Sequence, residues 1–270
     1  TAAGKWGRLR IGIHALIPGS FLADLIAQYR EDHPGIEVEM TEGTARDAVM
    51  QLRADRLDVA FVAGTPNLPD CHTRPIWTEP LVAVLPEQHR LAGQSAITWT
   101  DLAGETFLVR YGGTGPQVHD HIVLRHAGRW PAPSILRFDV ERGTLLSMVG
   151  QGFGITIVGA ATALLPTNGI VFLPFTDEPE PVAFSAVWSP SNRSAALRNL
   201  LSLANDMGRK VCTDYRSNTT DSEGVSDKST GTVQLSSSQF AVVEKSHKCT
   251  LVPWRPVINR QLSSEVCAGR

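Results

Sequence analysis

Histidine is the residue type whose spacing in this sequence comes nearest to a reactive site, because imidazole nitrogens bind zinc and transfer protons. His119, His121 and His126 fall within Val118 to Ala127, a segment that the pattern predicts to be a helix. Positions 119 and 121 of a helix point to different faces, so a solvated helix face explains these histidines better than a metal site. We find no convincing Ser/His/Asp set, carboxylate pair or His/Cys/Glu cluster, and we expect no catalytic residue, no metal and no cofactor.

Two glycine-rich segments resemble phosphate-binding loops only superficially. Tyr111 to Gly115 and Gly152 to Gly154 both lack the Gly-Lys-Ser/Thr sequence that holds a triphosphate and Mg²⁺. We interpret them as sharp turns, and Gly152 suits the end of a helix at Gln151 because glycine tolerates a positive φ.

The composition favours a globular protein without a polyanionic partner. The chain has 270 residues, 42% of them hydrophobic, and a formal net charge of -2. No apolar run reaches the length of a membrane span or forms a signal-peptide core, so we expect a cytoplasmic protein that does not bind membranes. The four cysteines have neither metal-binding nor disulfide-framework spacing. The start at Thr1, within a few residues of a strand, suggests a fragment of a longer protein.

Alternating strand and helix patterns predict an α/β fold with parallel strands and right-handed crossovers. The first unit is predicted as strand, helix, strand, helix and strand at Arg8 to His14, Ser20 to Asp32, Ile36 to Met40, Ala45 to Asp55 and Asp58 to Ala63. After a buried strand at Leu81 to Leu85 and a short helix before Leu102, a second unit follows. Its strands are predicted at Thr106 to Tyr111, Ser134 to Val140 and Gly154 to Val158, and its helices at Val118 to Ala127 and Thr144 to Gln151. Late strands at Val171 to Leu173 and Val182 to Trp188 and a closing helix at Ala195 to Met207 follow.

The character of the sequence changes after Lys210. Residues 211–270 are rich in Ser and Thr and lack the periodicity of packed elements, which predicts a mostly disordered tail that could be foreign to the original domain. A small hairpin around Val233 to Val243 is the alternative.

Loops that follow the strands of a parallel sheet are the expected ligand site, because such sheets bind ligands at the carboxyl ends of their strands. Helix N-termini at this edge favour an anion. Thr44 and Thr144 could add hydroxyl donors and Arg110 a full charge, although each threonine could equally be an ordinary helix cap. The loops are His14 to Ser20, Gly43 to Thr44, Ala63 to Pro66, Arg110 to Thr114 and Val140 to Thr144.

Several motifs together resemble the effector domain of LysR-type transcriptional regulators, over about Gly4 to Met207. The motifs are Gly7 to Gly12, His33 to Ile36, Leu57 to Phe61, Pro80 to Pro86, Asp101 to Gly104 and Val149 to Ile155, in the family's order and spacing. The resemblance implies the type II periplasmic-binding-protein fold, in which two α/β lobes joined by two crossover strands bind an effector between them. It places residues 1–84 and 189–210 in the first lobe and 85–188 in the second, with the crossovers at Leu85 and Trp188.

The resemblance implies effector contacts near the strand ends, but one position departs from the family. Leu16 stands where relatives usually have Ser or Thr, which removes a donor. This indicates an effector that is more apolar or one that is held instead by backbone N–H groups, Thr44 and Arg110. The expected effector-binding residues are Ala15, Leu16, Ile17, Thr44, Ala63, Arg110, Tyr111, Val140, Glu141 and Thr156.

The expected function is to sense a small, anionic metabolite and to transmit its binding to a DNA-binding domain. The winged helix-turn-helix that binds DNA in this family is absent from the sequence, so DNA is a partner only through that missing part. The resemblance also implies a homodimer, with the helix Ser20 to Asp32 against Val118 to Ala127 of a second subunit, and a homotetramer for the full-length protein. The alternatives are a transporter's solute-binding protein and an enzyme on the same scaffold, for which loss of turnover on mutation of Arg110 would be the sign.

Overall fold

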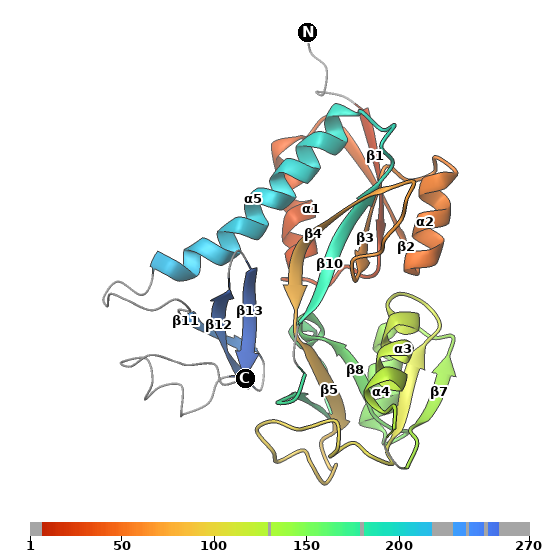
Figure 1. Cartoon of the computed structure of the whole chain (residues 1–270), viewed down its shortest axis with the longest axis vertical. Coiled ribbons are helices and arrows are strands. Elements are labelled where there is room, and N and C mark those ends of the chain that lie inside the picture. The colour runs from red at the N-terminus through yellow and green to blue at the C-terminus, as the bar shows by residue number, and fades with distance from the viewer. Residues whose placement is uncertain are drawn as a thin grey trace.

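The computed structural model describes residues 7–128, 131–178, 181–217, 229–235, 238–245 and 248–253. These residues form two α/β lobes, one above the other in Figure 1, and a separate three-stranded sheet at their side. We call residues 7–79 and 182–209 lobe I, and residues 81–178 lobe II.

Lobe I is built on one mixed sheet with the strand order β2-β1-β3-β10-β4. The strands are β1 (Gly7–Ile13), β2 (Ile36–Glu42), β3 (Val59–Ala63), β4 (His72–Glu79) and β10 (Val182–Trp188). Strand β1 pairs in parallel with β2 and β3, which confirms the predicted parallel unit, and β10 runs antiparallel between β3 and β4.

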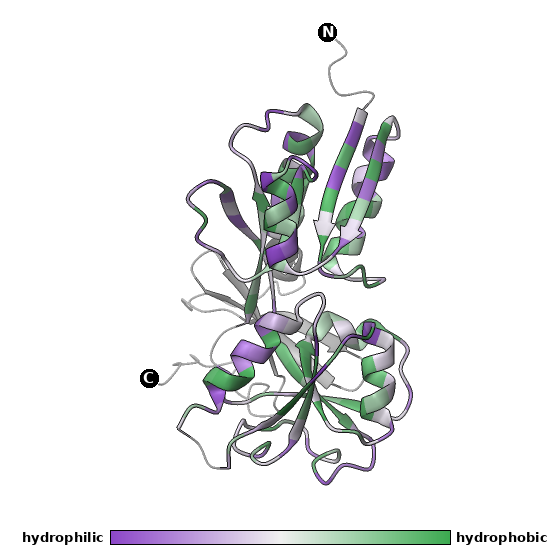
Figure 2. Cartoon of the chain, turned by 90° about the vertical axis from the view of Figure 1, so that its right-hand side faces the viewer, coloured by the Kyte–Doolittle hydropathy of each residue, from purple (hydrophilic) through white to green (hydrophobic). Residues whose placement is uncertain are grey.

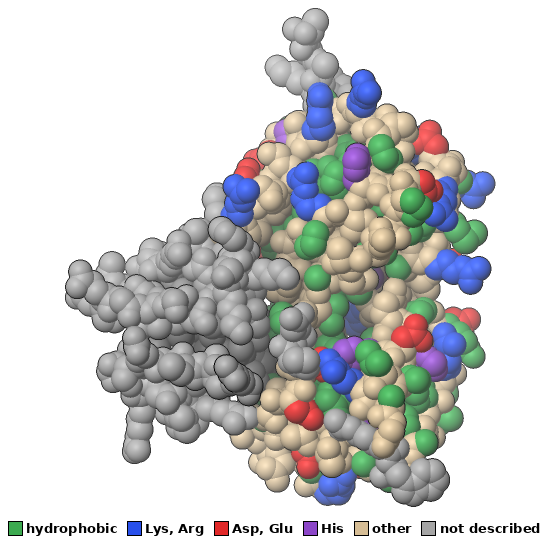
Figure 3. Space-filling model, in the orientation of Figure 1, with side chains coloured by type: hydrophobic (Ala, Val, Ile, Leu, Met, Phe, Trp, Pro, Cys, Tyr) green, Lys and Arg blue, Asp and Glu red, His purple; other side chains and the backbone are tan. Residues whose placement is uncertain are grey.

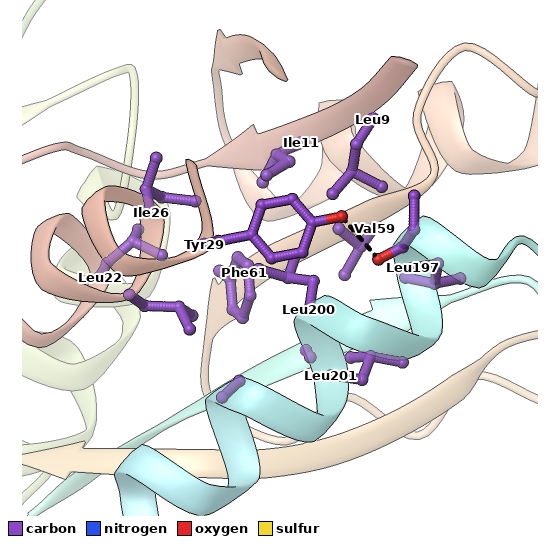
Figure 4. Close-up of a cluster of buried hydrophobic side chains, with 14 of the residues drawn as sticks. Leu9, Ile11, Leu22, Ile26, Tyr29, Val59, Phe61, Leu197, Leu200 and Leu201 are labelled. Carbon is purple, nitrogen blue, oxygen red and sulfur yellow. Dashed lines mark hydrogen bonds between the residues drawn. The ribbon is translucent and has the colours of Figure 1, made fainter. Parts of the chain in front are cut away.

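Two helices cover one face of this sheet and form the core of lobe I (Figure 4). They are α1 (Phe21–Asp32) and α5 (Ala195–Ser217). Ser20 caps α1 by accepting a hydrogen bond from the Ala23 amide at 3.3 Å. The apolar residues of α1 recur at helical spacing and are buried against β1, β3 and α5, with Tyr29 fully enclosed. Helix α2 (Ala45–Arg53) packs on the opposite face through Ala48 and Leu52.

Lobe II contains two small sheets enclosed by helices. Strands β8 (Thr156–Gly159), β5 (Leu81–Pro86) and β9 (Ile170–Pro174) form an antiparallel sheet, and β6 (Thr106–Arg110) pairs in parallel with β7 (Ser134–Phe138). The helices are α3 (Gly115–Arg125), α4 (Arg142–Gly150) and the 3₁₀ helix η1 (Ala160–Leu164). Figure 2 shows that the central strands of this lobe are predominantly hydrophobic, as expected of strands buried on both faces.

The chain passes between the lobes at positions that correct the predicted boundaries. The first passage lies at Pro80, between β4 of lobe I and β5 of lobe II, and not at Leu85, which pairs within lobe II. The second passage precedes β10, and Trp188 pairs with His72 inside lobe I. Strand β10 therefore belongs to lobe I, whereas the sequence assigned residues 85–188 to lobe II.

The predicted elements also differ from the structure outside the lobe boundaries. Strand β4 was not predicted, because Pro75 within it interrupts the strand pattern and its register shifts opposite Phe184 and Ser185. The segment before Leu102 forms turns and not the predicted short helix. Helix α5 continues ten residues beyond its predicted end at Met207, to Ser217.

Three strands follow α5 in the segment that the sequence predicts to be mostly disordered. They are β11 (Ser229–Leu235), β12 (Ser238–Lys245) and β13 (Lys248–Pro253), paired antiparallel in this order. The hairpin around Val233 to Val243, which the sequence offers as the alternative to disorder, lies within β11 and β12. The sheet contacts α5 and β4 of lobe I and β9 and η1 of lobe II (Figure 1).

The described ranges lack two features that would indicate other functional classes. No helix there combines the length and hydrophobicity that a membrane span requires. The same residues contain no group of three or more His, Cys, Asp or Glu side chains that could hold a metal ion.

Candidate functional site: a cavity between the lobes

A cavity that encloses about 700 Å³ of space, part of it open to solvent, lies between the two lobes, and we call it the large cavity. Lobe I contributes His14, Ala15, Ile17, Ser20, Leu22, Trp77, Glu79 and Phe184. Lobe II contributes Val109, Arg110, Thr114, Gly115, Val118, Arg142, Leu145, Leu146, Thr156, Ile157, Val158, Gly159, Ala161 and Thr162.

A second, smaller cavity of about 220 Å³ adjoins the first. His14 and Thr114 line both cavities and therefore stand between them. The remaining residues of the small cavity are Ile13, Gly43, Thr44, Ala45, Ala48, Phe61, Val62 and Ala63 of lobe I and Gly113 and Gln117 of lobe II.

Several helices begin at these cavities. Ser20 at the start of α1, Gly115 at the start of α3 and Arg142 at the start of α4 line the large cavity, and Thr44 at the start of α2 lines the small one. A helix N-terminus presents unpaired N–H groups and partial positive charge. The backbone alone therefore makes the space between the lobes favourable for an anion.

Arg142 adds a full positive charge to the large cavity. Its guanidinium makes no hydrogen bond or ion pair with any residue that the structure describes. Burial, then the neighbouring charge of Arg110, lower the pKa of Arg142, while the carboxyls of Glu42, Glu79 and Glu141 oppose this change. An arginine still carries its charge at neutral pH, so the cavity holds a cation without a counter-ion in contact.

Arg110 also lines the large cavity, but its guanidinium already has partners. Its Nε donates to the Val140 carbonyl at 2.9 Å, and one terminal nitrogen lies 3.1 Å from Glu141. The same nitrogen is 3.6 Å from the carboxylate of Glu42, which belongs to lobe I. Arg110 therefore links the end of β6 to the segment before α4 within lobe II, and it also contacts Glu42 of lobe I across the cleft.

Two further titratable side chains line the large cavity, and burial favours the neutral form of both. The Glu79 carboxylate accepts hydrogen bonds from Trp77 Nε1 at 2.9 Å and from the Ala161 amide at 3.3 Å. Burial raises the pKa of Glu79 against these two bonds and the charge of Arg142. Burial and then the charge of Arg142 lower the pKa of His14 to about 4, against a hydrogen bond with the Phe61 backbone.

Aromatic rings form the lobe I wall beside His14. The Phe184 ring stacks on Trp77 with centroids 4.9 Å apart, and His14 lies 4.7 Å from Phe184. The large cavity thus combines an aromatic wall on one lobe with a cation and helix N-termini on the other. This combination suits a flat or cyclic molecule that carries an acidic group.

The structure brings six of the ten predicted effector residues to the cavities. Ala15, Ile17, Arg110 and Thr156 line the large cavity, and Thr44 and Ala63 line the small one. The other four line neither cavity. Leu16 is 42% exposed, Tyr111 packs under Arg137, Val140 offers its carbonyl to Arg110, and the Glu141 side chain is 83% exposed.

The threonine hydroxyls expected as ligand donors are engaged or lie elsewhere. Thr44 donates to the Asp47 carboxylate at 2.6 Å and accepts from the Asp47 amide, which completes a capping box. Thr156 donates to the Leu108 carbonyl at 2.6 Å. Thr144 lies exposed within α4 and outside both cavities, because α4 begins at Arg142, two residues earlier than predicted.

Sequence reasoning missed the most distinctive residues of the large cavity. Trp77 and Glu79 were overlooked because they lie on the unpredicted strand β4. His14 and Arg142 fall in two of the predicted ligand loops but were not singled out. Their position at a strand end and at a helix start was the signal that could have identified them.

The comparisons with known proteins agree with this architecture. Residues 2–209 match the family described as the LysR substrate binding domain, and residues 187–269 match a family described as a protein of unknown function, DUF3363. The transcriptional regulator CatR of Pseudomonas putida is 30% identical over 156 residues, which cover 58% of this chain and 53% of CatR. IlvR of Caulobacter vibrioides is 28% identical over 211 residues, which cover 76% of this chain and 69% of IlvR. The match to CatR thus spans about half of that regulator.

Solved effector-binding domains share the fold. The effector binding domain of a BenM variant superposes with a TM-score of 0.68 at 20% identity, covering 76% of this chain and 96% of that domain. The effector binding domain of QuiR in complex with shikimate gives a TM-score of 0.66 at 20% identity, covering 76% of this chain and 98% of that domain. The two lobes have the type II periplasmic-binding-protein fold that the sequence predicted. The chain belongs to the LysR substrate-binding domain family.

Proposed function

We propose that this chain is the effector-sensing domain of a LysR-type transcriptional regulator and that it binds a small anionic metabolite between its lobes. The unpaired guanidinium of Arg142 at the start of α4 is the observation that carries the proposal, because a carboxylate of the effector would supply its missing counter-charge. The aromatic wall of Trp77 and Phe184 would receive the body of the molecule.

Binding would act on the arrangement of the lobes. A ligand that contacts both lobes at once stabilises the closed arrangement over the open one by its differential affinity for the two. Contacts with Trp77 in lobe I and Arg142 in lobe II meet this condition. The altered arrangement would be transmitted to a DNA-binding domain carried outside these residues.

The family supports a regulator over the two alternatives. CatR and IlvR are both named transcriptional regulators, which favours this function over a transporter's solute-binding protein and over an enzyme. On the face shown in Figure 3, the Lys and Arg side chains of lobe I lie apart from one another and form no continuous patch. The formal net charge of -2 suits a domain that senses a ligand better than one that binds DNA. We further propose a cytoplasmic homodimer, and a homotetramer for the complete regulator.

We also propose that residues 211–270 are a unit separate from the effector domain. The family match of the effector domain ends at residue 209, and the second match continues to residue 269. Among the described side chains, Ala204 is the last buried residue of the lobe I core and Met207 is the last that packs against it.

The binding of carboxylates tests the proposed function directly. Isothermal titration calorimetry of the whole chain with benzoate and shikimate, which solved relatives bind according to their names, would measure affinity. We expect binding by the wild type and a loss of at least about 10-fold in Arg142→Gln, because a hydrogen bond to a charged group contributes roughly 1.5 to 3 kcal/mol.

Arg137→Gln is the matched control. Arg137 belongs to β7, lies over the Tyr111 ring and lines neither cavity. Its substitution should therefore leave the affinity unchanged. Equal losses in both variants, or carboxylate binding that Arg142→Gln leaves intact, would contradict the role of Arg142.

A further inference from the structure

Glu79 lies at the first passage of the chain between the lobes and makes contacts on both sides of it. It is the last residue of β4 in lobe I and precedes Pro80, after which β5 of lobe II begins. Its Oε1 accepts a hydrogen bond from Trp77 Nε1 of lobe I at 2.9 Å, and its Oε2 accepts one from the Ala161 amide of lobe II at 3.3 Å. One carboxylate therefore joins the two lobes beside the connection.

The Glu79 carboxylate packs closely against the backbone of lobe II. Gly159 at the end of β8 precedes η1, and a Cβ atom added there would lie 2.6 Å from Glu79 Oε2. The glycine thus leaves the space that the carboxylate occupies. Because close-packed groups transmit displacements, we expect a change at this carboxylate to move η1 relative to β4.

Opposing influences act on the charge of Glu79. Burial raises its pKa, whereas the two hydrogen bonds and the positive charge of Arg142 lower it. Glu79 and Arg142 both line the large cavity, and Arg142 lies at the start of α4 in lobe II. The charge of Glu79 therefore depends in part on a cation that a bound anion would neutralise.

The remaining titratable groups of the cavity wall are neutral or already paired. Among the described residues they are His14 and Arg110. His14 is neutral at pH 7, because its pKa is about 4, and Arg110 is paired with Glu141 at 3.1 Å. The segments that contact the Glu79 carboxylate from lobe II, η1 and the end of β8, contain no titratable side chain. Arg142 is thus the charge that controls Glu79.

We propose that Glu79 is the switch between the large cavity and the first passage: its carboxylate joins β4 to η1, and an anion bound at Arg142 loosens this joint. The anion cancels the attraction of Arg142 for the carboxylate and adds its own repulsion, so Glu79 takes up a proton from solvent. A protonated carboxyl accepts less well at one oxygen, while Trp77 and Ala161 both present N–H donors to it. This inference rests on the proposed function and adds the residue that couples the anion to the lobes.

Nuclear magnetic resonance of the whole chain tests this switch. The Trp77 indole and Ala161 amide protons both report on the Glu79 carboxylate, so we expect their chemical shifts to titrate with one common midpoint. This midpoint should move to higher pH by at least about half a pH unit in ligand-free Arg142→Gln, which lacks the cation. It should move in the same direction in the wild type saturated with benzoate.

The chain provides controls for both parts of the measurement. The Trp99 indole donates to Glu178, which lines neither cavity, so its titration should be the same in every sample. Gly159→Ala should push the carboxylate away from η1, so that the Ala161 amide loses its pH dependence while the indole in lobe I keeps it. Gly93→Ala, where the added Cβ atom meets nothing within 4 Å, should change neither signal.

Small-angle X-ray scattering measures the joint itself. The radius of gyration of the ligand-free wild type should rise as the pH falls through the midpoint seen by magnetic resonance. Glu79→Gln should have the larger radius throughout this pH range and show no such rise. The same midpoint in His14→Phe would assign the change to Glu79 and not to His14.

The outcomes separate this inference from the proposed function. If Arg142→Gln and the wild type titrate with the same midpoint, or if benzoate binds in calorimetry without moving it, the switch is refuted while the anion site stands. A radius of gyration that does not follow the midpoint would refute the joint between the lobes. If benzoate does not bind, the proposed function fails, and the ligand-free comparison with Arg142→Gln still decides whether Arg142 controls Glu79.

Discussion

Arg110 and Glu42 form an ion pair across the cleft. Arg110 ends β6 in lobe II, Glu42 ends β2 in lobe I, and the guanidinium nitrogen lies 3.6 Å from the carboxylate oxygen. The Arg110 side chain is only 10% exposed and is fixed by Val140 and Glu141 of its own lobe, whereas the Glu42 side chain is 43% exposed. The pair therefore joins a rigid cation to a partly solvated anion, and we expect it to favour the closed arrangement weakly.

Glu42→Gln should shift the free protein towards an open arrangement. Partly exposed ion pairs contribute roughly 0.2 to 1 kcal/mol, so the open-to-closed ratio should change by no more than about 5-fold. Small-angle X-ray scattering at low and high salt would measure this as a radius of gyration that rises with salt in the wild type and less so in the variant. Glu39→Gln is the control, since Glu39 pairs with Arg8 inside lobe I. The same salt response in Glu42→Gln as in the wild type would rule out the pair as an interlobe contact.

Gly113→Ala should separate the lobes by steric contact. Gly113 has a φ of +57°, and a Cβ atom there would lie 3.1 Å from the His14 carbonyl oxygen of lobe I and 3.2 Å from the Arg110 guanidinium. We expect weaker binding of benzoate and a larger radius of gyration. Gly152→Ala is a matched control, because Gly152 has a φ of +81° and no atom within 4 Å of the added Cβ. Both variants carry backbone strain of about 1 kcal/mol. A loss of binding in both would therefore show that strain, and not the contact of the added Cβ atom with His14, weakens binding.

Much of the fold could be predicted from the sequence because hydrophobic periodicity is local. The parallel unit of β1, β2 and β3 follows from alternating strands and amphipathic helices, and its pairing was confirmed. Strand β4 was missed because Pro75 disrupts the local pattern, while the pairing of this strand with β10 depends on residues about 110 positions away.

The site was predictable at the level of loops but not of individual side chains. The rule that ligands bind at the carboxyl ends of parallel strands identified the loops that contain His14, Thr114 and Arg142. The direction of each side chain depends on tertiary packing, which is why Leu16 faces solvent while its neighbours Ala15 and Ile17 are buried. The sequence singled out Arg110 as the charge of the site for the same reason, since nothing local shows that its guanidinium is engaged by Val140 and Glu141 and by the distant Glu42.

His14→Phe should make the stability of the protein less sensitive to acid. The pKa of His14 is about 4 in the folded chain, against 6.5 for an unperturbed histidine, so the unfolded state binds the proton first as the pH falls. The contribution of neutral His14 is fully present above pH 6.5 and is lost between pH 6.5 and about 4. The pKa difference corresponds to about 3 kcal/mol. Phenylalanine keeps the ring beside Phe184 but cannot be protonated.

Urea denaturation at pH 7 and pH 4.5 would measure this effect as a smaller difference in the free energy of unfolding for His14→Phe than for the wild type. His72→Gln is the control, at an exposed histidine on β4. If His14→Phe and His72→Gln lose the same free energy between the two pH values, protonation of His14 does not limit stability in acid.

Tyr29→Phe should destabilise lobe I without changing the cleft. Tyr29 is fully buried in α1, and its hydroxyl donates to the Ala196 carbonyl at the start of α5 at 3.0 Å (Figure 4). Burial raises the pKa of this hydroxyl to about 12, so it remains a donor at every pH at which the protein would be assayed. Removing the hydroxyl should cost about 1 kcal/mol, the usual net contribution of one hydrogen bond, and this would appear as a lower urea midpoint at an unchanged slope. Tyr111→Phe, at a half-exposed ring of lobe II, should change the midpoint by less than half as much. A Tyr29→Phe variant as stable as the wild type would show that α1 and α5 are held together by apolar packing alone.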